Sequence, residues 1–91
     1  MSRKRDRLEV IHDILLIIQD HHNSIKPTPL LRYSNLSTQS FNEYIRELIE
    51  KEFIREITDE KKRRFYTLTD KGFRYIDNYR VIRGFIEEFD L

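Results

Sequence analysis

Apolar residues recur every three or four positions over residues 5–22, which is the spacing of an amphipathic helix. Two neighbouring stripes share this segment, and such a wide apolar face predicts a central helix that is buried on more than one side. Asn23 follows as a residue suited to the helix exit. The apolar positions are Leu8, Val10, Ile11, Ile14, Leu15, Ile17 and Ile18.

A helix-turn-helix pattern comes next. Thr28 followed by Pro29 predicts a short helix over residues 29–34, because a hydroxyl caps free backbone N–H groups and proline has no N–H to lose. After a tight turn, Ser37 predicts the cap of a second amphipathic helix over residues 38–51. Two helices joined by about three residues form a helix-turn-helix. The inward positions of the second helix are Phe41, Ile45, Leu48 and Ile49.

The periodicity changes after this helix. The runs FIREI and RFYTL are rich in β-branched and aromatic residues, and the charged TDEKKR separates them, which predicts a β-hairpin with a long basic tip. Thr69 then predicts the cap of a last helix of about 20 residues. The expected fold class is mostly α with a small β-hairpin: a winged helix-turn-helix with a long C-terminal helix. We expect one domain over residues 1–91, with residues 1–69 as core and wing and residues 70–91 as a coiled-coil-like dimerisation helix.

Charge is unevenly distributed, although 17 Lys and Arg nearly balance 16 Asp and Glu. Residues 59–64 hold four cations and two anions, residues 3–7 hold four cations and one anion, and the final EEFDL holds three anions. Clustered cations repel one another, so the hairpin tip favours binding to a polyanion. The absence of cysteine excludes disulfides and cysteine metal sites. The longest apolar run, residues 14–18, is too short to cross a bilayer, and we expect a cytoplasmic, nucleoid-associated protein.

Enzymatic chemistry is not indicated. The chain lacks a phosphate-cradling glycine loop and a nucleophile paired with a base. His12, His21 and His22 are too sparse for a metal site, and the last two suit a helix C-terminus, where a cation is favoured. We therefore expect no enzyme, cofactor or metal, and neither a small-molecule ligand nor a membrane partner.

The helix over residues 38–51 predicts base recognition in double-stranded DNA, because the second helix of a helix-turn-helix enters the major groove. Gln and Asn bridge adenine, Arg forks onto guanine, and a Thr methyl contacts thymine. The alternative is that these polar residues only favour a first helical turn and solvent. Glu43, Glu47 and Glu50 on the same helix oppose deep insertion. The outward positions are Thr38, Gln39, Asn42 and Arg46.

The basic wing, residues 58–64, predicts contact with the phosphate backbone. Each phosphate that the wing neutralises steepens the fall of log K with log salt concentration by about 0.9. The alternatives are an arginine in a narrow minor groove or a merely solvated hairpin edge. Arg32 and Tyr33 are further candidates for phosphate contacts, and residues 3–7 suit either a flexible basic arm or a frayed terminus. The wing cations are Lys61, Lys62, Arg63 and Arg64.

The last helix carries an apolar seam with positions four, three, four and three residues apart, the period of a coiled coil. Phe73 and Ile76 lie beside it, placed to pack on their own domain. An exposed seam predicts a homodimer; the alternative is packing onto the first helix of the same chain. Basic residues lead and acidic residues end this helix, so antiparallel pairing sets opposite charges together, and Gly84 suits a close crossing. The predicted interface comprises Tyr75, Tyr79, Ile82, Gly84, Ile86 and Phe89.

Over nearly its whole length the chain resembles the small archaeal winged-helix proteins typified by the ten-kilodalton dimeric chromatin protein of Sulfolobus. YTLTDKG leading into a long helix and YIRELIEKEFI carry the resemblance, which implies DNA binding and dimerisation through the last helix. Such families usually have Gly at the left-handed helix exit, where this chain has Glu52, and this wing tip also lacks glycine.

We therefore expect a homodimeric transcriptional regulator or a nucleoid-associated protein. The alternative is a protein-interaction winged-helix subunit of a transcription or replication assembly that does not bind DNA directly.

Overall fold

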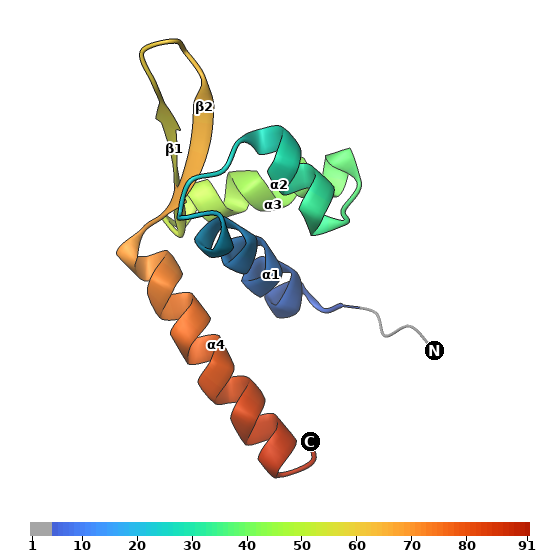
Figure 1. The fold of residues 1–91 in the computed structure, drawn as a ribbon. Helices are drawn as coiled ribbons and strands as arrows, with labels where there is room; N and C mark the ends of the chain where they lie inside the picture. The colour runs from blue at the N-terminus through green and yellow to red at the C-terminus, as the bar shows by residue number, and fades with distance from the viewer. Residues whose placement is uncertain (1–4) are drawn as a thin grey trace.

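A computed structural model describes residues 5–91 and shows three helices, a β-hairpin and a fourth helix, in that order. Figure 1 shows the hairpin and α4 starting at the same side of the three-helix body and running in opposite directions, the hairpin upward and α4 downward. The predicted fold class, a winged helix-turn-helix with a long C-terminal helix, is confirmed. The elements are α1 (Arg7–Asp20), α2 (Pro27–Ser34), α3 (Thr38–Glu50), β1 (Ile54–Thr58), β2 (Arg64–Leu68) and α4 (Asp70–Glu88).

Side-chain caps begin α3 and α4 at the predicted residues. The Ser37 hydroxyl accepts a hydrogen bond from Ser40 N at 3.1 Å, and the Thr69 hydroxyl accepts one from Gly72 N at 3.1 Å. Each bond satisfies a backbone donor that the first turn of a helix leaves free. The predictions for these two caps are therefore confirmed.

The predicted start of α2 was wrong by two residues. The helix begins at Pro27, and Lys26 precedes it in an extended conformation without a side-chain cap. Pro27 replaces the predicted Pro29 in the first helical position, because any proline there has the φ angle of a helix and needs no donor. Thr28 consequently lies inside the first turn and does not cap it.

Left-handed residues end α1 and α3. His22 and Asn23 have φ values of 60° and 59°, and Asn23 Oδ1 accepts a hydrogen bond from Leu68 N at 2.6 Å. Glu52 has φ 62°, as the comparison with glycine-bearing families predicted. The N–H groups of Glu52 and Phe53 return to carbonyls of α3, which is how a helix end satisfies its last acceptors.

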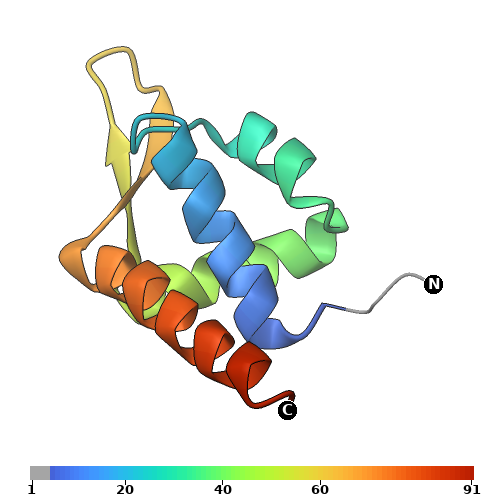
Figure 2. The ribbon, with the colours of Figure 1, turned by 60° about the horizontal axis from the view of Figure 1, so that its bottom comes forward.

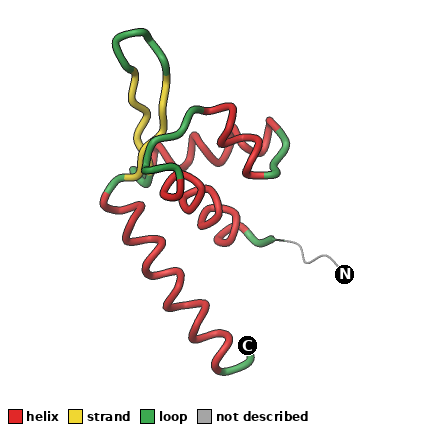
Figure 3. The backbone as a smooth tube through the Cα atoms, in the orientation of Figure 1, coloured by secondary structure: helices red, strands yellow, loops and turns green. Residues whose placement is uncertain are grey.

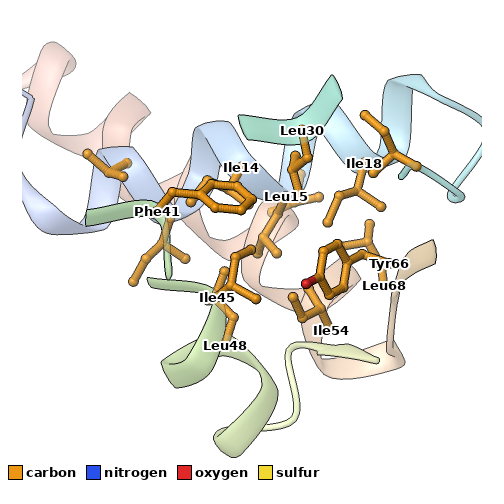
Figure 4. Close-up of a cluster of buried hydrophobic side chains, with 14 residues drawn as sticks. Ile14, Leu15, Ile18, Leu30, Phe41, Ile45, Leu48, Ile54, Tyr66 and Leu68 are labelled. Atoms are coloured by element: carbon orange, nitrogen blue, oxygen red, sulfur yellow. The ribbon is translucent and has the colours of Figure 1, made fainter. Parts of the chain in front are cut away.

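One hydrophobic core joins α1 to every other element (Figure 4). Two residues of the predicted apolar faces do not join it: Leu8 is 53% exposed and Ile49 is 36% exposed. Both lie in a terminal turn of their helix, beyond the area that neighbouring elements cover. The buried residues are Val10, Ile11, Ile14, Leu15, Ile18, Ile25, Leu30, Phe41, Ile45, Leu48, Ile54, Tyr66, Leu68 and Ile76.

The hairpin is a two-stranded antiparallel sheet that pairs Ile54 with Leu68 at its base and Thr58 with Arg64 near its tip. On its other side, β2 pairs with the α1–α2 connection. Tyr66 N donates to Ile25 O at 2.8 Å, and Ile25 N donates to Tyr66 O at 3.2 Å. The base of the wing is thus bonded to the body, while its outer part forms the loop drawn in green in Figure 3.

The first half of α4 packs against the body, and Ile76, at 1% exposed, enters the core as predicted. Figure 2 shows α4 passing α1. The Tyr75 hydroxyl donates to Leu8 O at 2.7 Å, which fixes this crossing between residues far apart in the chain. The remainder of α4 extends past α1 as a rod.

Candidate nucleic-acid interface

The four predicted base-reading residues share the exposed face of α3. Phe41, Ile45 and Leu48 point into the core, so the helical period turns the positions between them to solvent. Their side chains offer amide donors and acceptors, a hydroxyl and a guanidinium, which are the groups that read base edges. The exposed set is Thr38, Gln39, Asn42 and Arg46.

The acidic residues on α3 are partly neutralised within the chain. Arg7 Nη1 donates to Glu47 Oε1 at 2.6 Å, and Lys51 Nζ donates to Glu47 Oε2 at 2.7 Å. Glu43 accepts a long hydrogen bond from Gln39 at 3.5 Å. Because Glu47 is held between two cations, less negative charge on α3 opposes a phosphate backbone than the sequence implies.

Asp59 organises the tip of the wing. Its Oδ1 accepts hydrogen bonds from the backbone N–H groups of Lys61 and Arg63, both at 2.9 Å, and its Oδ2 accepts one from Arg63 Nε at 2.7 Å. The backbone bond from Arg63 is the main reason that the pKa of Asp59 lies below its usual value. Lys62 adopts the left-handed conformation, φ 63°, that closes a turn without glycine.

The four wing cations are therefore not equivalent. Arg63 is bound to Asp59, and Arg64 lies 3.8 Å from Glu56. No ion pair joins Lys61 or Lys62 to any residue that the structure describes. Two unpaired ammonium groups at the end of a projecting hairpin are free to bind phosphate.

A basic groove of 310 Å³ separates the wing from the start of α2. Lys62, Arg63 and Arg64 line one side, and Lys26 and Thr28 line the other. Figure 1 shows β2 rising beside the first turn of α2. Sequence reasoning missed Lys26, which lies directly before the first proline of α2 and reaches the wing only in the folded chain.

Arg32 and Tyr33 are exposed at the end of α2, where the sequence predicted phosphate contacts. The Tyr33 ring lies 5.1 Å from the ring of His21, and His21 Nδ1 lies 2.8 Å from the Ile17 carbonyl. The structure thus holds Tyr33 beside the end of α1 and leaves its surface open to solvent.

The basic segment over residues 3–7 is neither a free arm nor frayed where the structure describes it. Arg5 donates to Asp13 Oδ2 and to the Ser34 carbonyl, both at 2.9 Å. Arg7 pairs with Glu47 on α3. Arg3 and Lys4 lie outside the described residues.

The first two positions of the predicted dimer seam contact their own chain, as the intrachain alternative required. The Tyr75 ring meets Phe53 edge-on at 5.4 Å, and Tyr79 stacks on His12 at 4.1 Å. Burial raises the pKa of Tyr75 to about 12.

The outer part of α4 presents an apolar face to solvent. Ile82 and Phe89 are 53% and 57% exposed, Ile86 is half-buried, and no heavy atom lies within 4 Å of a Cβ built on Gly84. Sequence reasoning missed Phe85, which is 55% exposed with its ring 4.8 Å from that of Phe89. The four-residue spacing between Phe85 and Phe89, which places both on one face of the helix, was the signal in the sequence.

Within residues 5–91, no helix has the length and apolar character needed to cross a membrane. The same described residues contain no group of three or more His, Asp or Glu side chains that could hold a metal ion.

A family model described as winged helix-turn-helix matches residues 4–87. An uncharacterised protein of Methanocaldococcus jannaschii, MJ0290, is 37% identical over 71 residues, which cover 78% of this chain and 30% of that protein. The chain therefore spans less than a third of the length of this curated relative.

Three solved structures share the fold. Sso10a-2, a DNA-binding protein from Sulfolobus solfataricus, has a TM-score of 0.71 and 19% identity, covering 94% of this chain and 90% of that one. MepR, a transcription regulator of the Staphylococcus aureus multidrug efflux pump MepA, has a TM-score of 0.75 and 16% identity, covering 88% and 60%. F93 from STIV, a winged-helix DNA-binding protein, has a TM-score of 0.71 and 18% identity, covering 87% and 90%.

Proposed function

This chain belongs to the winged helix-turn-helix family, and from that premise we propose that it is a homodimeric DNA-binding protein, either a transcriptional regulator or a nucleoid-associated protein. In this proposal α3 reads base edges, the wing binds phosphates, and residues 70–91 join the two subunits. The core and wing, residues 1–69, then act as one DNA-binding unit.

The wing tip carries the proposal. Lys61 and Lys62 have no ion pair with a described residue, whereas Arg63 and Arg64 lie beside carboxylates. Unpaired cations on a hairpin that projects from the body attract a polyanion and contribute nothing to the core. The basic groove beside α2 extends the same positive surface toward Lys26.

A salt titration tests the wing directly. Binding of a fluorescent duplex is measured by anisotropy at several salt concentrations, for the unmodified protein and for K61A/K62A. Removing two phosphate contacts is expected to reduce the slope of log K against log salt by about 1.8 per subunit, or about 0.9 for each phosphate.

The matched control is R80A/R83A, which removes the same charge from α4, away from the wing (Figure 1). Because both residues lie in the proposed dimerisation helix, all three proteins are compared at a concentration at which each sediments as a dimer. It is expected to leave the slope close to that of the unmodified protein. Equal slopes for K61A/K62A and the unmodified protein would contradict the wing contact. If R80A/R83A reduced the slope as much as K61A/K62A does, the effect would come from net charge and not from the wing.

Selection on random duplexes separates the two DNA-binding roles. A regulator enriches a defined inverted repeat, and N42A or R46A then relaxes preference at one position by about 1–3 kcal/mol. A nucleoid-associated protein coats DNA evenly, and neither substitution changes its preference.

A protein-interaction role is the second candidate, because Glu43 and Glu50 remain exposed on α3 without a cation to neutralise them among the described residues. This second role is supported if the protein does not shift mixed duplex DNA in a gel at low salt, and if K61A/K62A does not change that result.

A further inference from the structure

A groove of 380 Å³ opens where α4 leaves the body, beside the first turn of α1. Its apolar lining includes Leu8 and Ile82, both 53% exposed, and the rings of Phe53, Tyr75 and Tyr79. The Tyr75 hydroxyl is already bonded to Leu8 O, so this side chain offers the groove mainly its ring. Apolar side chains gathered around an open groove gain from being covered.

We propose that the groove receives Phe89 of a second copy of this chain, so that each subunit of the dimer inserts the outer end of α4 between α1 and α4 of the other. This inference rests on the homodimer proposed above. It specifies which residues of the two subunits meet, and it makes α1 part of the contact between them.

Helix geometry places Phe89 at the groove. When two α4 helices pair antiparallel through the exposed face of Ile82, Phe85 and Phe89 and cross at the level of residue 84, residues equally far before and after the crossing lie opposite each other. Tyr79, in the groove wall, lies about 7.5 Å before the crossing and Phe89 about 7.5 Å beyond it, at 1.5 Å per residue.

Charge favours the same arrangement. Lys71 and Arg74 line the groove, and Glu87, Glu88 and Asp90 surround Phe89 in the sequence. Lys71 is held in place, since its Nζ donates to Lys51 O at 2.7 Å and lies 4.8 Å from the centre of the Phe53 ring. Antiparallel insertion therefore brings three carboxylates toward two cations, whereas parallel pairing brings carboxylates together and leaves the groove open.

The size of the groove suits an aromatic ring. A cavity of about 150 Å³ is enough to hold benzene, and this groove measures 380 Å³. One phenyl ring leaves room for part of a second side chain, and Phe85 lies 4.8 Å from Phe89, measured between ring centroids. The symmetry of a two-fold dimer fills both grooves at once.

Cysteine cross-linking tests the contact, because the chain has no cysteine of its own. Leu8 and Phe89 are both about half exposed, so L8C/F89C is expected to fold. A short bis-maleimide is expected to convert this variant to covalent dimers, seen on a denaturing gel. F89C alone is the control: its two thiols stand about 15 Å apart along the antiparallel pair, ten residues at 1.5 Å each, and are expected to remain unlinked.

Each result decides between arrangements. Covalent dimers of F89C alone would overturn the antiparallel insertion in favour of parallel helices. Unlinked L8C/F89C that still sediments as a dimer would overturn the groove contact but keep the proposed homodimer. Unmodified protein that sediments as a monomer would overturn the homodimer and this inference with it.

A charge exchange provides a second readout that does not depend on thiols. Each variant alone, R74E or E87K/E88K, places like charges at both grooves. The dissociation constant of its dimer is expected to be at least ten-fold higher than that of the unmodified protein. Mixing the two variants restores opposite charges at both grooves, so the mixture is expected to recover dimers in native mass spectrometry. A mixture that dissociates like its components would overturn the groove contact.

Discussion

The imidazole of His12 lies against the Tyr79 ring where α1 meets α4, with 4.1 Å between the ring centroids and 20° between the planes. Burial lowers the pKa of His12, and Arg80 lowers it further, while the charges of Asp13 and Glu9 act in the opposite direction. The buried Nε2 of His12 has no hydrogen-bond partner among the described residues. A proton on this ring therefore costs more in the folded chain than in the unfolded one.

Acidification below pH 6.5 is consequently expected to destabilise the protein. The pKa of His12 is lower in the folded state than the 6.5 of the unfolded chain. The stability that neutral His12 contributes is therefore complete above pH 6.5 and is lost as the pH falls below that value. The lowered pKa of Asp59 acts in a separate window, below its ordinary 3.8. Thermal unfolding followed by circular dichroism is expected to show a falling Tm below pH 6.5.

H12Q is expected to flatten that part of the Tm profile, because the replacement does not titrate. The exposed His22 provides the control, and H22Q is expected to keep the slope of the unmodified protein. Parallel profiles for H12Q and the unmodified protein would contradict the role given to His12.

At the scale of elements, the junction between β2 and α4 is held by several close backbone contacts. Thr69 N donates to Phe53 O at 3.1 Å, and the Thr69 hydroxyl lies 2.5 Å from Glu52 O. Gly72, in the first turn of α4, packs so closely that a Cβ there would lie 2.3 Å from Phe53 O. The pattern Leu-Thr-x-x-Gly that follows the wing thus has a steric cause as well as a capping one.

G72A is expected to destabilise the protein by about 1–3 kcal/mol, the usual cost of overpacking, since a backbone carbonyl cannot move aside as a flexible side chain does. G84A adds the same methyl group to the same helix in open space. In dilute protein it is expected to gain up to about 1 kcal/mol from helix propensity. Urea unfolding of both variants measures the difference, and equal effects at the two glycines would refute the steric argument.

Local chemistry explains which elements the sequence could predict. The caps at Ser37 and Thr69 and the two strands depend on neighbours within a few residues, so the chain reveals them directly. The left-handed Glu52 was expected only from the resemblance to families that have Gly there. Whether an apolar residue at a helix end is covered depends on an element far away in the sequence, which is why Leu8 and Ile49 were assigned to the core.

The candidate site divides in the same way. The exposed face of α3 follows from its helical period, and the wing cations follow from composition. The pairing of Glu47 with Arg7, and the groove that brings Lys26 to the wing, need chain segments that only the folded structure brings together.

At the scale of the whole molecule, the described chain is elongated, with extents of 50 × 29 × 22 Å. The wing and the free part of α4 lie at opposite ends (Figure 1), so the proposed DNA contact and the proposed subunit contact use separate surfaces. The exposed apolar face of α4 includes Ile82, Phe85 and Phe89.

I82K/F85K is expected to yield monomers in sedimentation equilibrium, because burying two ammonium groups in an apolar contact is strongly unfavourable. D77K, which adds a lysine at an exposed polar position of the same helix, is expected to remain dimeric. Dimers of I82K/F85K at the concentration that dimerises the unmodified protein would refute the proposed role of α4.

The hydrogen bond from Tyr75 to Leu8, which joins residues 67 positions apart in the chain, has a consequence for synthesis. A ribosome delivers a chain from its N-terminus onward, at roughly 5–20 residues each second. Until α4 emerges, the side of α1 that meets it has no cover, and Ile76 is missing from the core. The helix-turn-helix and the wing therefore remain incompletely packed until α4, which is synthesised after both of them, has emerged.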